Sequence, residues 1–331
     1  MRRSSSTVRN DGQAFLAALV CVLALFVAEP GRADVPLYQA VVPLQGATEA
    51  DRQAGFAAAL RVVAVRATGQ RDAAANALVA QAAADPAGYV QHYGTTAGRM
   101  LKVGFDPRAT EQLLLRAGLP LWPAERPATL VLLAVPAAAG TNRLVVAGST
   151  TPERAEIERV AQARGLPIVW PRTGVDVERA REQVLSGDAD AVAAAATTER
   201  AQAVLVGVAG GAGVEWAFGH AGRSARQRGS LQDGAHLAAD TLAARYAPAS
   251  TRASSVVTIR VTGVESVRAY AGLLEYLQSL SMVRQVGVDE LAGGTVRLEL
   301  AMHGDLELLR RIAALDGRLQ PGTEGDFTFQ P

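Results

Sequence analysis

The sequence predicts a mixed α/β and α+β fold made of three small modules. In the middle of the chain, continuous apolar runs alternate with segments of helical periodicity, which is typical of a layered α/β module. Further on, the predicted elements follow the order β-α-β-β-α, which indicates a split-βαβ, ferredoxin-like sandwich. The domains expected are a signal peptide over 1–33, an N-terminal α+β domain over 34–125, a central α/β domain over 126–249 and a C-terminal split-βαβ domain over 250–331.

Composition narrows the classes of protein that fit. The chain has 331 residues, of which 49% are hydrophobic and 20% charged, and this balance excludes a disordered or collagen-like protein. There are 33 basic and 32 acidic residues, so the formal charge is only +1. A nucleic-acid-binding protein usually concentrates basic charge, so no nucleic-acid partner is expected.

The first 33 residues have the three-part pattern of a secretory signal peptide. Arg2, Arg3 and Arg9 precede an apolar run over 14–27, and small residues lead up to Ala33. As a helix, the apolar run would span only about 21 Å, which is short of a bilayer core of about 30 Å. We therefore expect cleavage after Ala33, a periplasmic protein and no stable membrane insertion afterwards; an uncleaved N-terminal anchor is the alternative.

The only cysteine, Cys21, lies inside this apolar run. Cleavage would leave a mature chain without cysteine. That chain would have no disulfide, no thiolate metal site and no cysteine nucleophile.

Helix caps define the first module. Thr48 is placed to cap a helix whose apolar residues recur every three or four positions and which ends at Gly69. Asp106 caps a later helix that has Pro107 in its first turn. The elements expected are a strand over 37–44, helices over 48–69 and 76–84, a strand over 100–105 and a helix over 107–118.

Two apolar runs, 129–135 and 203–208, predict the buried strands of the second module. The glycine-rich stretch 207–213 is interpreted as a hairpin turn. A dinucleotide loop would open a helix, whereas strand-like alternation follows here. The other elements expected are strands over 144–147, 166–170 and 214–218 and helices over 151–165, 177–185, 189–199 and 236–246.

The third module is predicted by a strand over 296–302 whose apolar and polar residues alternate, so that one face packs and one is solvated. Gly293 and Gly294 form the turn before it, and Asp305 caps a last helix. The helix over 266–280 is expected to bury one face, made of Val267, Tyr270, Ala271, Leu274 and Leu277. Strands are expected over 256–261 and 283–288.

No motif for a catalytic, cofactor-binding or metal site is found. The four histidines do not have metal-ligand spacing, there is no phosphate loop, and Asp188 is interpreted as a helix cap. The 222–229 stretch holds three arginines and is expected to be a solvated hairpin, with a role in facing acidic groups as the alternative.

Five residues are candidates for partner contact. Arg66 and Arg71 flank a helix end that can receive an anion or a partner's carboxylate; the alternative is a glycine cap with arginines at the helix dipole. Trp122 lies in a proline-rich link. Trp216 and His220 are neighbours near an expected loop.

A series of short motifs runs through most of the chain in a fixed order. They are Leu37-Tyr38 through Pro43, Val65–Gly69, Tyr89–Gln91 with Tyr93, Val103–Asp106, Gly118–Trp122, Arg126-Pro127, Arg164–Pro167, Pro171, and Val204–Gly207 followed by Trp216. In these the chain resembles a bacterial family known as domain of unknown function 2066. That resemblance implies export to the cell envelope of a Gram-negative bacterium and supplies no reaction.

Two functions are compatible with the sequence. The favoured one is a non-enzymatic accessory of envelope assembly whose partners are envelope proteins. The rival is a periplasmic hydrolase or small-ligand binder with a site between domains, for which two or more of Asp176, Asp188, His220 and Arg172 should meet in a deep pocket.

Overall fold

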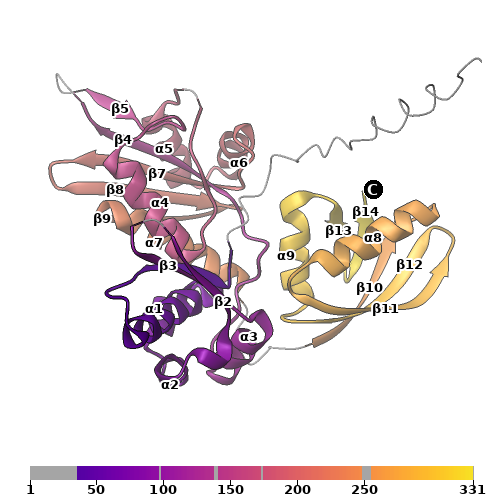
Figure 1. Cartoon of the computed structure of the whole chain (residues 1–331). Coiled ribbons are helices and arrows are strands. Elements are labelled where there is room, and N and C mark those ends of the chain that lie inside the picture. Colours follow the sequence, from indigo (N-terminus) through magenta and orange to yellow (C-terminus); the bar gives the residue numbers. More distant parts are fainter. Residues whose placement is uncertain (1–35, 97, 138–140, 173, 248–254, 331) are drawn as a thin grey trace, which may run out of the picture. The chain divides into compact units, whose positions relative to one another are not determined.

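The computed structural model describes residues 36–96, 98–137, 141–172, 174–247 and 255–330. The predicted signal peptide with Cys21, and residues 248–254 around the expected boundary between the second and third domains, lie outside these residues. From Ala33 to Pro331 the chain forms one compact unit. The described part contains three sheets with helices packed on them, which confirms the predicted mixed α/β class (Figure 1).

The first sheet is antiparallel and has the strand order β1-β3-β2. Its strands are β1 (Gln39–Pro43), β2 (Val90–Thr96) and β3 (Met100–Phe105). The long helix α1 (Glu49–Thr68) covers one face and buries its apolar stripe there. Its ends are those the sequence predicts, a capping box at Thr48 and a left-handed Gly69 with φ of 70°.

Short helices surround α1. They are η1 (Arg71–Ala75), α2 (Ala77–Ala84), η2 (Ala87–Tyr89) and α3 (Pro107–Arg116). Strand β2 was not among the predicted elements. Most of its side chains are exposed, so its sequence carries no apolar run to identify it.

The second sheet has the order β5-β4-β7-β8-β9, with β6 also paired to β4. Strands β4 (Thr129–Pro136) and β7 (Ala203–Gly210) are parallel, and both are buried almost throughout. Strands β8 (Gly213–His220) and β9 (Arg223–Gly229) continue from β7 as antiparallel hairpins, and β9 forms the edge. The glycine-rich stretch is therefore a hairpin turn, as predicted.

Helices cover both faces of this sheet. Helices α4 (Pro152–Arg164) and α7 (Leu231–Tyr246) pack on one face, and α5 (Val177–Ser186) and α6 (Ala189–Thr198) on the other (Figure 1). Alternate residues of β4 and β7 supply the two cores, which explains why both strands are apolar at nearly every position.

The third sheet has the order β11-β12-β10-β14-β13. Its βαββα part consists of β10 (Ser255–Thr262), α8 (Val267–Ser279), β11 (Val283–Ala292), β12 (Thr295–Met302) and α9 (Leu306–Asp316). The chain then adds β13 (Leu319–Pro321) and β14 (Asp326–Phe329). Strand β14 runs parallel to β10 and lies between β10 and β13.

Several predicted boundaries are wrong. The strand expected over 144–147 is β5 (Asn142–Leu144), and the one over 166–170 shortens to β6 (Ile168–Val169). Helix α7 begins at Leu231, five residues before its predicted start, because Ser230 and Asp233 form a capping box. The 222–229 stretch, by contrast, is the solvated hairpin that was expected: it is chiefly the exposed strand β9, which pairs antiparallel with β8.

The predicted buried face of α8 is partly wrong: Leu277 is buried and Tyr270 and Leu274 pack against the core, but Val267 and Ala271 are exposed. The helix buries Ala269, Leu273, Tyr276 and Leu277, whereas Val267 is 85% exposed. Val267 is the first residue of the helix, and the buried stripe begins about a half-turn later, at Ala269.

Two features of the described residues bear on function. Among the described residues, no helix has both the length and the apolarity needed to cross a bilayer. In the same part of the chain, no three His, Cys, Asp or Glu residues are grouped closely enough to hold a metal ion.

Candidate functional site

Three arginines are buried together where α1, α4 and the proline-rich link meet. Arg66, Arg126 and Arg164 are 4%, 3% and 2% exposed. Burial of a guanidinium is costly unless its N–H groups find acceptors. The partners of these three side chains therefore define what the cluster does. We call Arg66, Arg126 and Arg164 the arginine cluster.

Arg126 is held by backbone carbonyls. Its Nε donates to Pro123 O at 3.0 Å, Nη1 to Gly165 O at 2.8 Å, and Nη2 to Arg66 O at 2.8 Å and Trp122 O at 3.0 Å. Two of these carbonyls lie at the C-terminal ends of α1 and α4, where the helix dipole favours a cation. Burial lowers the pKa of Arg126 to about 9, so the group stays charged at neutral pH. Arg126 therefore ties two helix ends and the link together.

The ring of Trp122 packs against the Arg126 guanidinium. The Arg126 guanidinium lies 3.9 Å from the centre of the Trp122 ring, a cation–π contact. The Trp122 side chain is buried, and its backbone N–H donates to Ala67 O at 2.8 Å. The candidate residue Trp122 is thus placed in the core, beneath Arg126.

Arg66 holds the chain segment that enters the first sheet. Its Nη1 donates to Pro36 O at 2.7 Å and also to Gln39 O. Burial lowers the pKa of Arg66 to about 10. The side chain therefore faces carbonyls inside the protein, and it does not extend to where a partner's carboxylate would arrive.

Arg164 links α4 to α7 and to the end of α1. Its Nη2 donates to Asp240 Oδ1 at 2.5 Å and to Gly69 O at 2.7 Å, and its Nη1 to His236 Nδ1 at 2.8 Å. An arginine can only donate, so His236 Nδ1 accepts and the imidazole is neutral with its proton on Nε2. Burial, with Arg164 and Arg71 nearby, lowers the pKa of His236, which agrees with this tautomer.

Arg71 is the member of this region that reaches solvent. Its Nη2 lies 3.1 Å from Asp240 Oδ2, and the two side chains are 59% and 41% exposed. The Asp240 carboxylate therefore bridges Arg71 at the surface and Arg164 in the interior. A cavity of about 500 Å³ opens here, lined by Thr68–Asp72, Pro120, Asp240, Ala243, Ala244 and Ala247.

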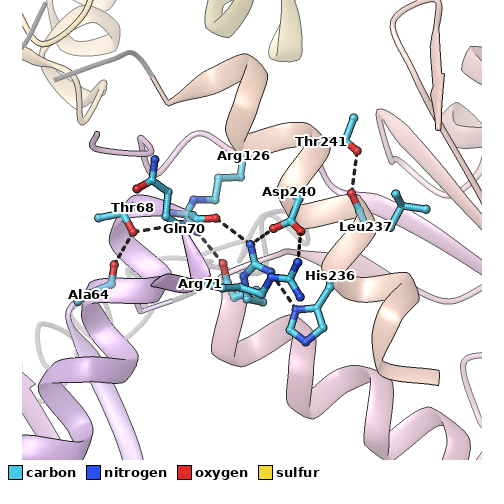
Figure 2. Close-up of polar contacts among 11 residues, drawn as sticks. Ala64, Thr68, Gln70, Arg71, Arg126, His236, Leu237, Asp240 and Thr241 are labelled. Carbon is cyan, nitrogen blue, oxygen red and sulfur yellow. Dashed lines mark hydrogen bonds and ion pairs between the residues drawn. The ribbon is translucent and has the colours of Figure 1, made fainter. Parts of the chain in front are cut away.

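The cavity wall is fixed by local hydrogen bonds. Thr68 Oγ1 donates to Ala64 O at 2.7 Å and accepts from the backbone N–H of Gln70 at 3.1 Å (Figure 2). These bonds end α1 and set the turn that carries Gln70 and Arg71. The turn therefore places polar groups of Gln70 and Arg71 beside the apolar residues Pro120, Ala243, Ala244 and Ala247 that also line the cavity.

The candidates Trp216 and His220 lie apart from this cluster, on β8. Trp216 is buried against Gly234 and donates from Nε1 to Ser230 O at 2.9 Å. His220 was expected in a loop, and this is wrong: it ends β8 and is buried. Its Nδ1 lies 2.8 Å from Gln202 O and its Nε2 2.8 Å from the Tyr246 hydroxyl.

The geometry settles the tautomer of His220 as well. A carbonyl can only accept, so Nδ1 carries the proton and Nε2 accepts from Tyr246. Burial lowers the pKa of His220 and raises that of Tyr246. The pair is a neutral hydrogen bond that joins β8 to α7.

The four residues proposed for a hydrolytic or ligand site have separate roles. Asp176 and Asp188 cap α5 and α6. Arg172 Nε lies 2.9 Å from Glu199 Oε2. Within the described ranges, no hydrogen bond or ion pair joins any two of Asp176, Asp188, Arg172 and His220.

Arg126, Arg164, His236 and Asp240 belong to the site but were not predicted. Arg164 stands directly before a capping glycine, as Gly165 ends α4. An arginine in a last helical turn is ordinarily solvated there, so nothing in the neighbouring residues indicates that Arg164 is buried. His236 and Asp240 lie one turn apart on α7, a spacing that places both on one helix face.

Comparison with known proteins gives one match. Residues 33–123 match a family described as Domain of unknown function (DUF8605). This region covers the first sheet with α1, α2 and α3, and it reaches the link at Pro123. Comparisons with curated proteins and with solved structures found no match.

The resemblance to domain of unknown function 2066 is therefore wrong. Two of the motifs that suggested it are helix ends, Arg-x-Thr-Gly at Gly69 and Arg-Gly at Gly165. Left-handed glycine caps preceded by arginine follow from local backbone geometry and arise in unrelated chains. Over residues 33–123, the chain matches the DUF8605 domain.

Proposed function

We propose that this protein is a non-enzymatic interaction module that acts in the cell envelope after export. The leader-like pattern over 1–33 supports export, and the contacts of the arginine cluster support a structural use of its polar groups. The partners proposed are other envelope proteins.

The single observation that carries the proposal is the state of the two histidines His236 and His220. A general base needs a free lone pair within reach of a substrate proton. In His236 that lone pair accepts the Arg164 N–H, and in His220 it accepts the Tyr246 hydroxyl. Both imidazoles thus hold elements of the protein together.

Export and partner contact are tested in the cell that makes the protein. Osmotic-shock fractionation with intact-mass measurement should give a periplasmic chain that begins at residue 34. A cytosolic chain that retains residues 1–33 contradicts the export part of the proposal.

Partner contact is tested by placing a photo-crosslinking amino acid at exposed positions on each sheet, Tyr93, Gln227 and Val256. We expect a discrete adduct of defined mass from at least one position and none from Arg61 on α1. Three positions without any discrete adduct contradict an interaction role.

The cavity beside Arg71 favours a second candidate, a binder of small zwitterions. A ligand carboxylate would face Arg71, and its ammonium group would face Asp240 and Asp72. The measurement is thermal unfolding with a panel of amino acids. Stabilisation of the wild type that is lost in Arg71→Ala supports binding, and no stabilisation by any member contradicts it.

A further inference from the structure

Strand β9 is the open edge of the second sheet. The sheet order ends at β9, and no strand among the described residues pairs with its outer side. An edge strand presents unpaired backbone N–H and C=O groups, so another extended chain can add to it. This edge has seven residues, long enough for a peptide segment of similar length.

The side chains of this edge are strongly basic. Strand β9 contains Arg223, Arg226 and Arg228 and no acidic residue. Arg226 and Arg228 are two positions apart, so both project to the face that α5 covers. On that face, a groove of about 450 Å³ runs between α5 and the strands, lined by Arg181, Leu185, Glu215–Ala217 and Arg226–Arg228.

The groove holds more positive than negative charge. Its three guanidiniums, Arg181, Arg226 and Arg228, face a single lining carboxylate, Glu215, which leaves a net charge of +2. Arg181 Nη2 lies 2.8 Å from Glu215 Oε2, and Arg228 pairs with the other oxygen. On the rim, Glu178 lies 3.7 Å from Arg181.

Among the described residues, Arg226 is the arginine of the groove that has no partner within the protein. In the part of the chain that the structure describes, no carboxylate or hydrogen-bond acceptor contacts its guanidinium, and the side chain is exposed. The two carboxylate oxygens of Glu215 already pair with Arg181 and Arg228, so Glu215 does little to neutralise the charge of Arg226. An incoming carboxylate is the partner that this geometry lacks.

Charge on an edge strand also opposes self-association. A second copy adding its own β9 would place arginines against arginines, so like-charge repulsion opposes that pairing. The same charges favour a strand whose residues on one face are acidic. The edge therefore excludes its own copy and selects an acidic partner.

We propose that the free edge of β9, with its arginine groove, binds an extended acidic segment of a partner protein by strand addition. This inference rests on the interaction role proposed above and names the surface and the chemistry of its partner. The backbone of the segment would pair with β9. Its acidic side chains would face Arg226 and Arg228.

The test uses the purified chain and a fluorescein-labelled peptide of seven residues that alternates threonine with glutamate. We expect saturable binding by fluorescence anisotropy, weakened about fivefold or more when salt rises from about 20 mM to about 200 mM, since screening acts on exposed charges. Arg226→Glu and Arg226→Gln should each weaken binding about tenfold or more. Arg61→Glu, an exposed arginine on α1, should leave it unchanged.

Two further probes separate strand addition from plain charge attraction. The same peptide with alternate amides methylated, prepared in both registers, should lose binding in one register and keep it in the other. Equal binding of both forms overturns strand addition, as does equal binding of a threonine–lysine peptide. Binding to phosphatidylglycerol vesicles without binding to the peptide overturns the proposal in favour of a lipid surface.

Crosslinking in cells distinguishes failure of the β9 surface from failure of the proposed interaction role. If crosslinked adducts form in cells but Arg226→Glu leaves every one of them unchanged, this surface is wrong and the interaction role stands. If no adduct forms at any position, the interaction role itself is wrong.

Discussion

Arg164 Nη2 lies 2.5 Å from Oδ1 of Asp240, so a fully buried guanidinium is neutralised by a carboxylate whose other oxygen meets solvent and Arg71. The pair joins α4 to α7 across 76 positions of the chain. It therefore secures the packing of two helices on one face of the second sheet, and its removal has predictable effects.

Asp240→Asn should destabilise the protein by about 2 kcal/mol. Breaking a buried ion pair costs about 3–5 kcal/mol, and the half-exposed carboxylate reduces that figure. Urea unfolding measures the change. Arg71→Ala, which removes only the exposed partner of Asp240, should cost less than about 1 kcal/mol. Equal losses in the two variants would show that the buried pair contributes nothing special.

Arg126→Lys should destabilise by about 3 kcal/mol, because a lysine ammonium cannot reach carbonyls that lie on several sides of a planar guanidinium, and each lost hydrogen bond costs about 1 kcal/mol. Thermal unfolding is the measurement. The control is Arg108→Lys at an exposed position on α3, expected within about 0.5 kcal/mol of wild type. If Arg126→Lys is as stable as the wild type, the carbonyls that Arg126 contacts find hydrogen-bond donors in water instead, and the argument for Arg126 is wrong.

Gly69→Ala should cost more than about 3 kcal/mol. Gly69 has φ of 70°, and an added methyl group would overlap the Cβ of Ala243 and lie 2.8 Å from Cε3 of Trp122. Gly187 has a similar φ of 74° with nothing within 4 Å, so Gly187→Ala isolates the backbone strain, about 1 kcal/mol. Chemical denaturation of both variants compares them. The crowding explanation fails if the two losses are the same.

Stability should fall as the pH drops below about 6.5. Burial lowers the pKa values of His220 and His236, so the unfolded chain takes up protons at pH values where the folded chain does not. The contribution is complete above the ordinary histidine pKa of 6.5 and is lost between that value and the lowered folded values. Unfolding free energies from pH 8 to about 5 provide the measurement.

The variant His220→Gln can still donate to Gln202 O and accept from Tyr246, but it does not titrate. It should flatten the acid side of the stability curve, and His220→Gln combined with His236→Gln should flatten it further. An unchanged slope in the double variant would place the pH dependence elsewhere.

The features predictable from sequence are those fixed by neighbouring residues. Thr48 and Asp106 cap the helices they were expected to cap, and Gly69 ends α1, because capping depends on a few adjacent backbone groups. The parallel strands β4 and β7 were equally clear, since burial on both faces leaves a continuous apolar run.

The features missed depend on distant parts of the chain. Nothing near Arg126 indicates that its acceptors are Arg66 O and Gly165 O, which lie 60 and 39 positions away. The burial of His220 likewise depends on a distant partner, since its Nε2 bonds to the Tyr246 hydroxyl of α7, 26 positions away. Of the five candidate residues, Arg66, Arg71 and Trp122 lie around one region, and only Arg71 reaches solvent there.

The position of β14 has a consequence for the order in which the third sheet forms. Residues 326–329 fill the slot between β10 and β13, and Phe327 and Phe329 are buried there. If the third sheet forms in chain order from its N-terminal side, the flank of β10 stays uncovered until that late segment is in place. During this interval the half-built third sheet is open to mispairing, so delayed delivery of β14 is where aggregation would begin.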